Sequence, residues 1–142
     1  MNDLIDTSYT RLLGSIMFKV REKLTNRTKE LEVNPQQGRM ISYIAQHQDQ
    51  GIIQKDLADA FNRRGASITS MLQGLEKNGY IERKIQADNE RQKQIFVLEK
   101  GKAIVDQINE MFSSAEVELI ECLTEEEKAE FLRLLKKIDS NL

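Results

Sequence analysis

The sequence predicts a mainly α-helical fold with one small antiparallel β wing, and three observations indicate it. Hydrophobic residues recur at helical spacing near both ends of the chain, over residues 3–26 and again from residue 102 onward. Residues 54–61 and 66–79 carry two helical patterns separated by a short turn, which is the spacing of a helix-turn-helix. Two β-patterned runs, 80–85 and 94–98, flank a polar tip at 86–93. We therefore predict a winged helix-turn-helix between long terminal helices, with two wing strands, or three if Ile52 and Ile53 add one.

The helix predicted at residues 66–79 has two distinct faces. Its apolar residues recur at i, i+3, i+4 and i+7, so they should pack inward. The opposite face carries small or hydrogen-bonding side chains, which is what a helix entering the major groove of DNA needs to approach and read base edges. An amphipathic helix with a solvent-exposed polar face would show the same pattern. The turn, the wing and the placement of charge around the helix favour the DNA-reading interpretation. The inward set is Ile68, Met71, Leu72 and Leu75, and the predicted DNA-contacting set is Ala66, Ser67, Thr69, Ser70, Gln73 and Lys77, together with Gln54 on the preceding helix.

Positive charge is concentrated around this predicted helix. The 142-residue chain carries 21 Lys and Arg against 23 Asp and Glu, a net charge of −2 that by itself argues against a nucleic-acid partner. Residues 63–102, however, hold nine basic and five acidic side chains, for a net charge of +4. A local basic region of this kind is suited to phosphates. The predicted DNA contacts therefore also include the turn residues Arg63 and Arg64 and the wing residues Arg91 and Lys93.

The central segment resembles the MarR family of multiple antibiotic resistance regulators. The matching features are Leu57–Ala58, the LEKxGYIER pattern of residues 75–83, an acidic-then-arginine wing tip, and Lys100–Gly101. The flanking helices also fit, so the resemblance covers nearly the whole chain. It implies a homodimeric, repressor-type regulator that inserts one recognition helix per subunit into successive major grooves of double-stranded DNA and reaches the minor groove with each wing.

Two positions depart from the family pattern. The wing arginine of the family corresponds to Arg91, ten residues before Gly101, but Asn89 stands where the family carries the aspartate that supports it. We expect Asn89 and Arg91 to contact DNA, without that support. Arg64 stands where a hydroxyl residue often opens the recognition helix, so we expect a weaker helix cap and an added phosphate contact.

The terminal helices predict a dimer. The apolar stripe of residues 3–26 is long enough to need a cover, either the chain's own core or, as we favour, a second subunit. Near the C-terminus, Thr124 and Glu127 form a capping-box pattern that opens a last amphipathic helix. We predict dimerisation regions at 1–33 and 100–142 around a DNA-binding region at 34–99, and a homodimer that reads a palindrome. The predicted interface residues are Leu4, Ile5, Tyr9, Leu12, Leu13, Ile16, Leu119, Leu123, Phe131, Leu135 and Ile138.

Other function classes find little support. One histidine and one cysteine cannot build a zinc site, and His47 is expected to be solvated or locally hydrogen-bonded rather than catalytic. We expect no enzyme activity, cofactor or metal, no disulfide, no membrane span or signal peptide, and a cytoplasmic protein. Cys122 is expected to be a buried, inert thiol, since its neighbours Ile120 and Leu123 are apolar.

Two functions remain open. The first is a regulator released from DNA by a small hydrophobic or phenolic ligand, held between the dimer helices and the winged helix; the resemblance implies such a pocket. Tyr9, Met17, Met40 and Tyr43 are its candidate lining, although ordinary core packing explains each of them better. The second is a winged helix used as a protein-interaction module without sequence-specific DNA binding. The operator, the regulated genes and the effector are not determined by the sequence.

Overall fold

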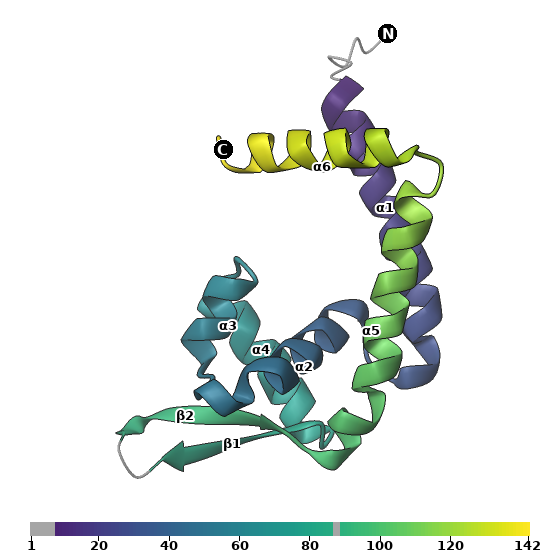
Figure 1. The fold of residues 1–142 in the computed structure, drawn as a ribbon. Helices are drawn as coiled ribbons and strands as arrows, with labels where there is room; N and C mark the ends of the chain where they lie inside the picture. The colour runs from purple at the N-terminus through teal and green to yellow at the C-terminus, as the bar shows by residue number, and fades with distance from the viewer. Residues whose placement is uncertain (1–7, 87–88) are drawn as a thin grey trace, which may run out of the picture.

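The fold, described by a computed structural model, consists of a winged-helix lobe and a long helical arm (Figure 1). The structure describes residues 8–86 and 89–142, and Leu4 and Ile5 of the predicted interface lie outside them. Within these residues the fold is mainly helical, as predicted. The elements are α1 (Ser8–Thr28), η1 (Lys29–Leu31), α2 (Pro35–His47), η2 (Gln48–Gln50), α3 (Gln54–Ala60), α4 (Gly65–Lys77), β1 (Ile81–Gln86), β2 (Asn89–Val97), α5 (Glu99–Ile120) and α6 (Glu125–Asp139).

Local signals set several of the helix boundaries. Asn34 caps α2 through a reciprocal capping box with Gln37, and Pro35 occupies the first helical position. Thr124 and Glu127 form the capping box predicted for α6. After α4, Gly79 adopts a left-handed backbone with φ +79°, which ends the helix and turns the chain into β1.

The wing is longer than the sequence predicted. β1 pairs with β2 antiparallel, with Ile81 opposite Val97 and Ile85 opposite Lys93. The prediction of a polar tip over residues 86–93 is wrong for most of its length, because β2 already begins at Asn89. Backbone pairing depends little on side-chain polarity, so the hairpin continues past its apolar base. The described sheet has two strands; Ile52 contributes one backbone hydrogen bond, from Ile95 N to Ile52 O at 2.9 Å, rather than a third strand.

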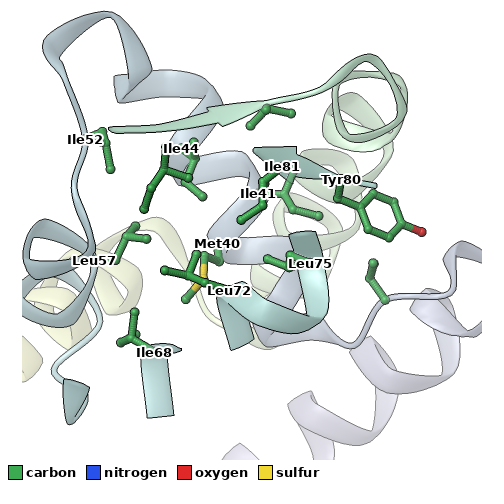
Figure 2. Close-up of a cluster of buried hydrophobic side chains, with 13 residues drawn as sticks. Met40, Ile41, Ile44, Ile52, Leu57, Ile68, Leu72, Leu75, Tyr80 and Ile81 are labelled. Atoms are coloured by element: carbon green, nitrogen blue, oxygen red, sulfur yellow. The ribbon is translucent and has the colours of Figure 1, made fainter. Parts of the chain in front are cut away.

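The core of the lobe lies between α2, α3, α4 and the base of the wing (Figure 2). The inward face predicted for α4 is confirmed: Ile68, Leu72 and Leu75 are fully buried, and Met71 packs partly buried against them. Gly101, in the first turn of α5, lies so close to the wing base that a Cβ there would be 2.6 Å from Tyr80 O. Close packing against α5 thus explains the glycine of the Lys100–Gly101 motif.

The arm is formed by α1 and α5, which pack side by side, and α6 follows α5 at the end of the arm far from the lobe (Figure 1). Glu118 of α5 accepts hydrogen bonds from Lys23 and Arg27 of α1, which ties these two helices together. Both cations lower the pKa of the Glu118 carboxyl, Arg27 more than Lys23. Beyond this contact the arm offers few buried side chains: only Leu24 and Thr28 of α1 are buried, and no residue of α6 is.

Candidate nucleic-acid interface

The turn between α3 and α4 presents two arginines to solvent. Asn62 takes a left-handed backbone with φ +50°, a conformation that asparagine tolerates better than most residues, and it redirects the chain toward α4. Arg64 occupies the N-cap of α4 and its side chain makes no capping hydrogen bond, as its departure from the family pattern predicted. Arg63 and Arg64 are exposed, and neither guanidinium has an ion-pair partner among the described residues.

These arginines border a shallow, open depression of about 370 Å³, whose lining is Phe61, Asn62, Arg63, Arg64 and Ser67. Guanidinium groups and a hydroxyl are donors suited to phosphate oxygens. The side chains that line the depression could therefore donate hydrogen bonds to a nucleic-acid phosphate at the start of α4.

The outer face of α4 lies beside this turn. Ala66, Ser70, Gln73 and Lys77 are exposed along it, and Ser67 is half-buried at its edge. The amphipathic prediction therefore places these side chains correctly. Their small size leaves the helix free to approach a groove, and Gln73 presents both an amide donor and an acceptor.

Gln54 and Thr69 differ from the other predicted DNA-contacting residues because their side chains are hydrogen-bonded to each other. The Gln54 side-chain amide donates to Thr69 Oγ1 and to the backbone carbonyl of Gly65. Thr69 Oγ1 in turn donates to the same carbonyl, at 2.9 Å. The only hydroxyl proton of Thr69 is thus already used, and Gln54 holds α3 against the first turn of α4. The sequence predicted both residues as DNA contacts; periodicity cannot detect a hydrogen bond between two helices.

The wing carries mixed charges. Arg83 Nε donates to Glu76 Oε2 at 2.8 Å, and this bond lowers the pKa of the Glu76 carboxyl. Lys84 pairs with Glu82 at 2.9 Å, so these basic residues of β1 are largely compensated. Lys93 is exposed on β2. Asn89 and Arg91 belong to β2 by their backbone, and their side chains lie outside the description.

Lys100 has a structural role that the sequence analysis did not find. Its Nζ donates to Asn78 O at 2.9 Å and lies 4.4 Å from the centroid of the Tyr80 ring. The lysine thereby fixes the end of α4 to the start of α5. Its position in the Lys100–Gly101 motif was the only available signal.

The candidate effector residues do not converge within one chain. Met40 is fully buried in the lobe core, whereas Tyr9 is 86% exposed and Met17 is 49% exposed on α1. Tyr43 is half-buried, with its ring stacked on His47. The single-chain structure thus supports core packing for Met40 and assembles no pocket from the four.

Two further predictions concern single residues. His47 is locally hydrogen-bonded as expected, since its Nδ1 lies 2.9 Å from Tyr43 O. The prediction for Cys122 is wrong: the thiol is exposed, because α5 ends at Ile120 and Cys122 lies in the turn that leads to α6. In the part of the chain that the structure describes, no group of His, Cys, Asp and Glu could hold a metal ion, and none of the described helices could span a membrane.

Comparison with known proteins adds the family. The MarR family model matches residues 33–93. A Clostridium acetobutylicum protein assigned to the MarR family of transcriptional regulators is 48% identical, with 96% of this chain and 100% of that chain covered and a TM-score of 0.65. Two structures with DNA are also similar: the MepR–DNA complex of S. aureus (28% identity, 94% and 98% covered, TM-score 0.91) and a Listeria monocytogenes MarR family protein complexed with a 26mer DNA (27% identity, 99% and 89% covered, TM-score 0.81). With 48% identity to a relative that it covers along the whole of that chain, and with a winged helix of the same architecture, the chain belongs to the MarR family of transcriptional regulators.

Proposed function

We propose that the protein is a sequence-specific DNA-binding repressor, acting in the cytoplasm as a homodimer on a palindromic operator. The observation that carries this proposal is the outer face of α4, where exposed small and amide side chains stand next to the uncompensated Arg63 and Arg64. Bases would be read by Gln73 and Ser70, and phosphates would be held by the arginines of the turn. The two DNA-bound relatives support the same use of the lobe.

The exposed apolar surface of the arm supports the homodimer. Large hydrophobic side chains on α1 and α6 are between 37% and 86% exposed, which is unfavourable for a chain that remains alone in water. A second copy with two-fold symmetry would cover both faces at once and would set the two α4 helices one helical turn of DNA apart, roughly 10 bp. The exposed set is Tyr9, Leu12, Leu13, Met17 and Phe18 on α1, and Leu132, Leu134, Leu135 and Ile138 on α6.

Dimerisation is tested by sedimentation equilibrium of the purified protein. The double variant Leu135→Gln/Ile138→Gln should dissociate at protein concentrations where the parent chain is dimeric. The matched control is Lys136→Gln, on the same helix but off the apolar stripe. Equal association of all three proteins would contradict the role of α6.

Sequence-specific binding is tested by fluorescence anisotropy with the DNA directly upstream of the gene and a scrambled control, over a salt series. The proposal expects tighter binding to the native fragment, with two chains per site. Equal, weak and steeply salt-dependent binding to both fragments would favour the interaction-module alternative or a target elsewhere. In vitro transcription from the bound fragment then tests repression, because an activator would raise the transcript level rather than lower it.

A further inference from the structure

Helix α5 is attached to the lobe at two places along its length. In its first turn, Gly101 lies against Tyr80 and Val97, where a Cβ would be 2.6 Å from an atom of each. About two turns further on, α5 packs against α2 (Figure 1). The direction of a straight helix is fixed only when it is held at two points. The contact with α2 therefore sets the angle at which the arm leaves the lobe.

Packing accounts for most of the contact between α2 and α5. Gly38 and Ile108 are both buried, and a Cβ at Gly38 would lie 3.4 Å from three side-chain atoms of Ile108. The guanidinium carbon of Arg39, an exposed residue, lies 5.1 Å from the centroid of the Phe112 ring. Hydrophobic packing is non-directional, so by itself it permits several nearby registers of α2 on α5.

A hydrogen bond crosses the same contact. Ser42 Oγ of α2 donates to Asn109 Oδ1 of α5. Ser42 is only 8% exposed, and Asn109 is half-buried. Among the described residues, no other hydrogen bond joins these two helices. A hydrogen bond is short-ranged and directional, and a buried hydroxyl without an acceptor is destabilising, so this bond favours one register over its neighbours.

We propose that Asn109, through its hydrogen bond to Ser42, is a positioning residue that sets the separation of DNA half-sites that the protein accepts. This role rests on the proposed two-fold dimer bound to a palindrome. From Gly101 to Ile120, α5 is about 28 Å long at about 1.5 Å per residue, so a change of about 4° in its direction moves the end of the arm by about 2 Å. Two symmetric arms double this displacement to about 4 Å, and one base pair adds about 3.4 Å to the separation of half-sites. A small change in the angle of the arm is thus comparable with one base pair.

The test variant is Ser42→Ala/Asn109→Leu, which removes donor and acceptor together and leaves neither of them buried and unpaired. The matched control is Ser113→Ala/Gln107→Leu, which makes similar changes at exposed positions of α5. Thermal unfolding followed by circular dichroism verifies that both variants fold. Ser42→Ala alone changes the packing least, and it should alter both measurements below in the same direction as the test variant.

The angle of the arm is measured without DNA, by double electron–electron resonance between two nitroxide labels. One label is placed on Cys122, the exposed cysteine after α5, and the other on Lys55→Cys, at an exposed position of α3. Dilution into Cys122→Ser chains restricts the signal to distances within one chain. The test variant should give a distance distribution that is broader than that of the parent chain or shifted by about 2 Å, the displacement that about 4° produces. Identical distributions for the parent, test and control proteins would overturn the positioning role.

The preferred spacing is measured by fluorescence anisotropy on the native upstream fragment and on versions with one base pair added or removed between the half-sites. The parent and control proteins should lose at least about tenfold in affinity on the altered fragments, as for a mismatched site, whereas the test variant should lose about threefold or less. Its ranking of base substitutions within a half-site should stay the same, because α4 is unchanged. Equal losses for all three proteins would overturn the role in spacing. If the parent chain does not select its native fragment, the proposed function fails and the role in spacing fails with it, while the resonance measurement still decides whether Asn109 sets the angle of the arm.

Discussion

Replacing Gln54 with alanine tests whether this residue positions the recognition helix α4 or instead reads bases. The variant removes the two hydrogen bonds that the Gln54 amide donates to Gly65 O and Thr69 Oγ1. The contact to Gly65 O is long, at 3.3 Å, so the loss corresponds to about one good neutral hydrogen bond, or about 1 kcal/mol. Since Arg64 supplies no cap, the first turn of α4 depends more strongly on this clamp.

A loss of about 1 kcal/mol in the ordering of α4 reduces the population competent to bind DNA and weakens the apparent affinity by up to about fivefold. This loss should be equal for every DNA sequence. Gln73→Ala should behave differently, because Gln73 is exposed on the outer face of α4. Its loss should relax discrimination at one or two base pairs per half-site, by about 1 to 3 kcal/mol.

The assay is anisotropy with the native operator and a panel of single base-pair substitutions. Gln107→Ala, an exposed glutamine of α5, serves as the matched control. A double-mutant cycle of Gln54→Ala with Thr69→Val should show a coupling of about 1 kcal/mol. If Gln54→Ala changed the base preference at a defined position, or if the two residues showed no coupling, the positioning role would be refuted.

Three further results are expected. Arg91→Ala should weaken binding to all sequences and reduce the salt slope by about one; an unchanged slope would contradict the phosphate or minor-groove role of the wing. Gly101→Ala should lower the free energy of unfolding by about 1 to 3 kcal/mol in urea titrations, because its Cβ would lie 2.6 Å from Tyr80 O, whereas Gly14→Ala meets no atom within 4 Å and should not destabilise. Arg83 lowers the pKa of Glu76, so the stabilisation is present above the ordinary value of 4.5 and is lost as pH falls through the lowered pKa. Glu76→Gln should therefore flatten the dependence of the unfolding free energy on pH in that acidic range, by less than about 1 kcal/mol since the carboxylate is substantially exposed, and an unaltered pH profile would argue against the Arg83 pair.

Several parts of the fold followed from local sequence signals. The 3.6-residue period placed Ile68, Leu72 and Leu75 in the core and left the outer face of α4 exposed. The capping-box pattern of Thr124 and Glu127 located the start of α6. These signals are readable because each depends on residues within one or two helical turns of each other.

The errors have a common physical origin. The wing extends into the polar tip because strand pairing is made by the backbone, and the exposure of Cys122 depends on where α5 stops. Neither the length of the wing strands nor the exposure of Cys122 can be predicted from the polarity of the neighbouring residues.

The sequence by itself determined the helical pattern, the helix-turn-helix spacing, the concentration of positive charge and the family resemblance, since these properties need only residue order and chemistry. The tertiary structure alone decided which polar side chains are free for a partner. Gln54 of α3 is hydrogen-bonded to Thr69 of α4, and the Lys100 ammonium lies over the Tyr80 ring. Asp59 of α3 and Tyr43 of α2 line the same depression. Such contacts depend on the three-dimensional packing of separate elements, on which the composition of each element carries no information.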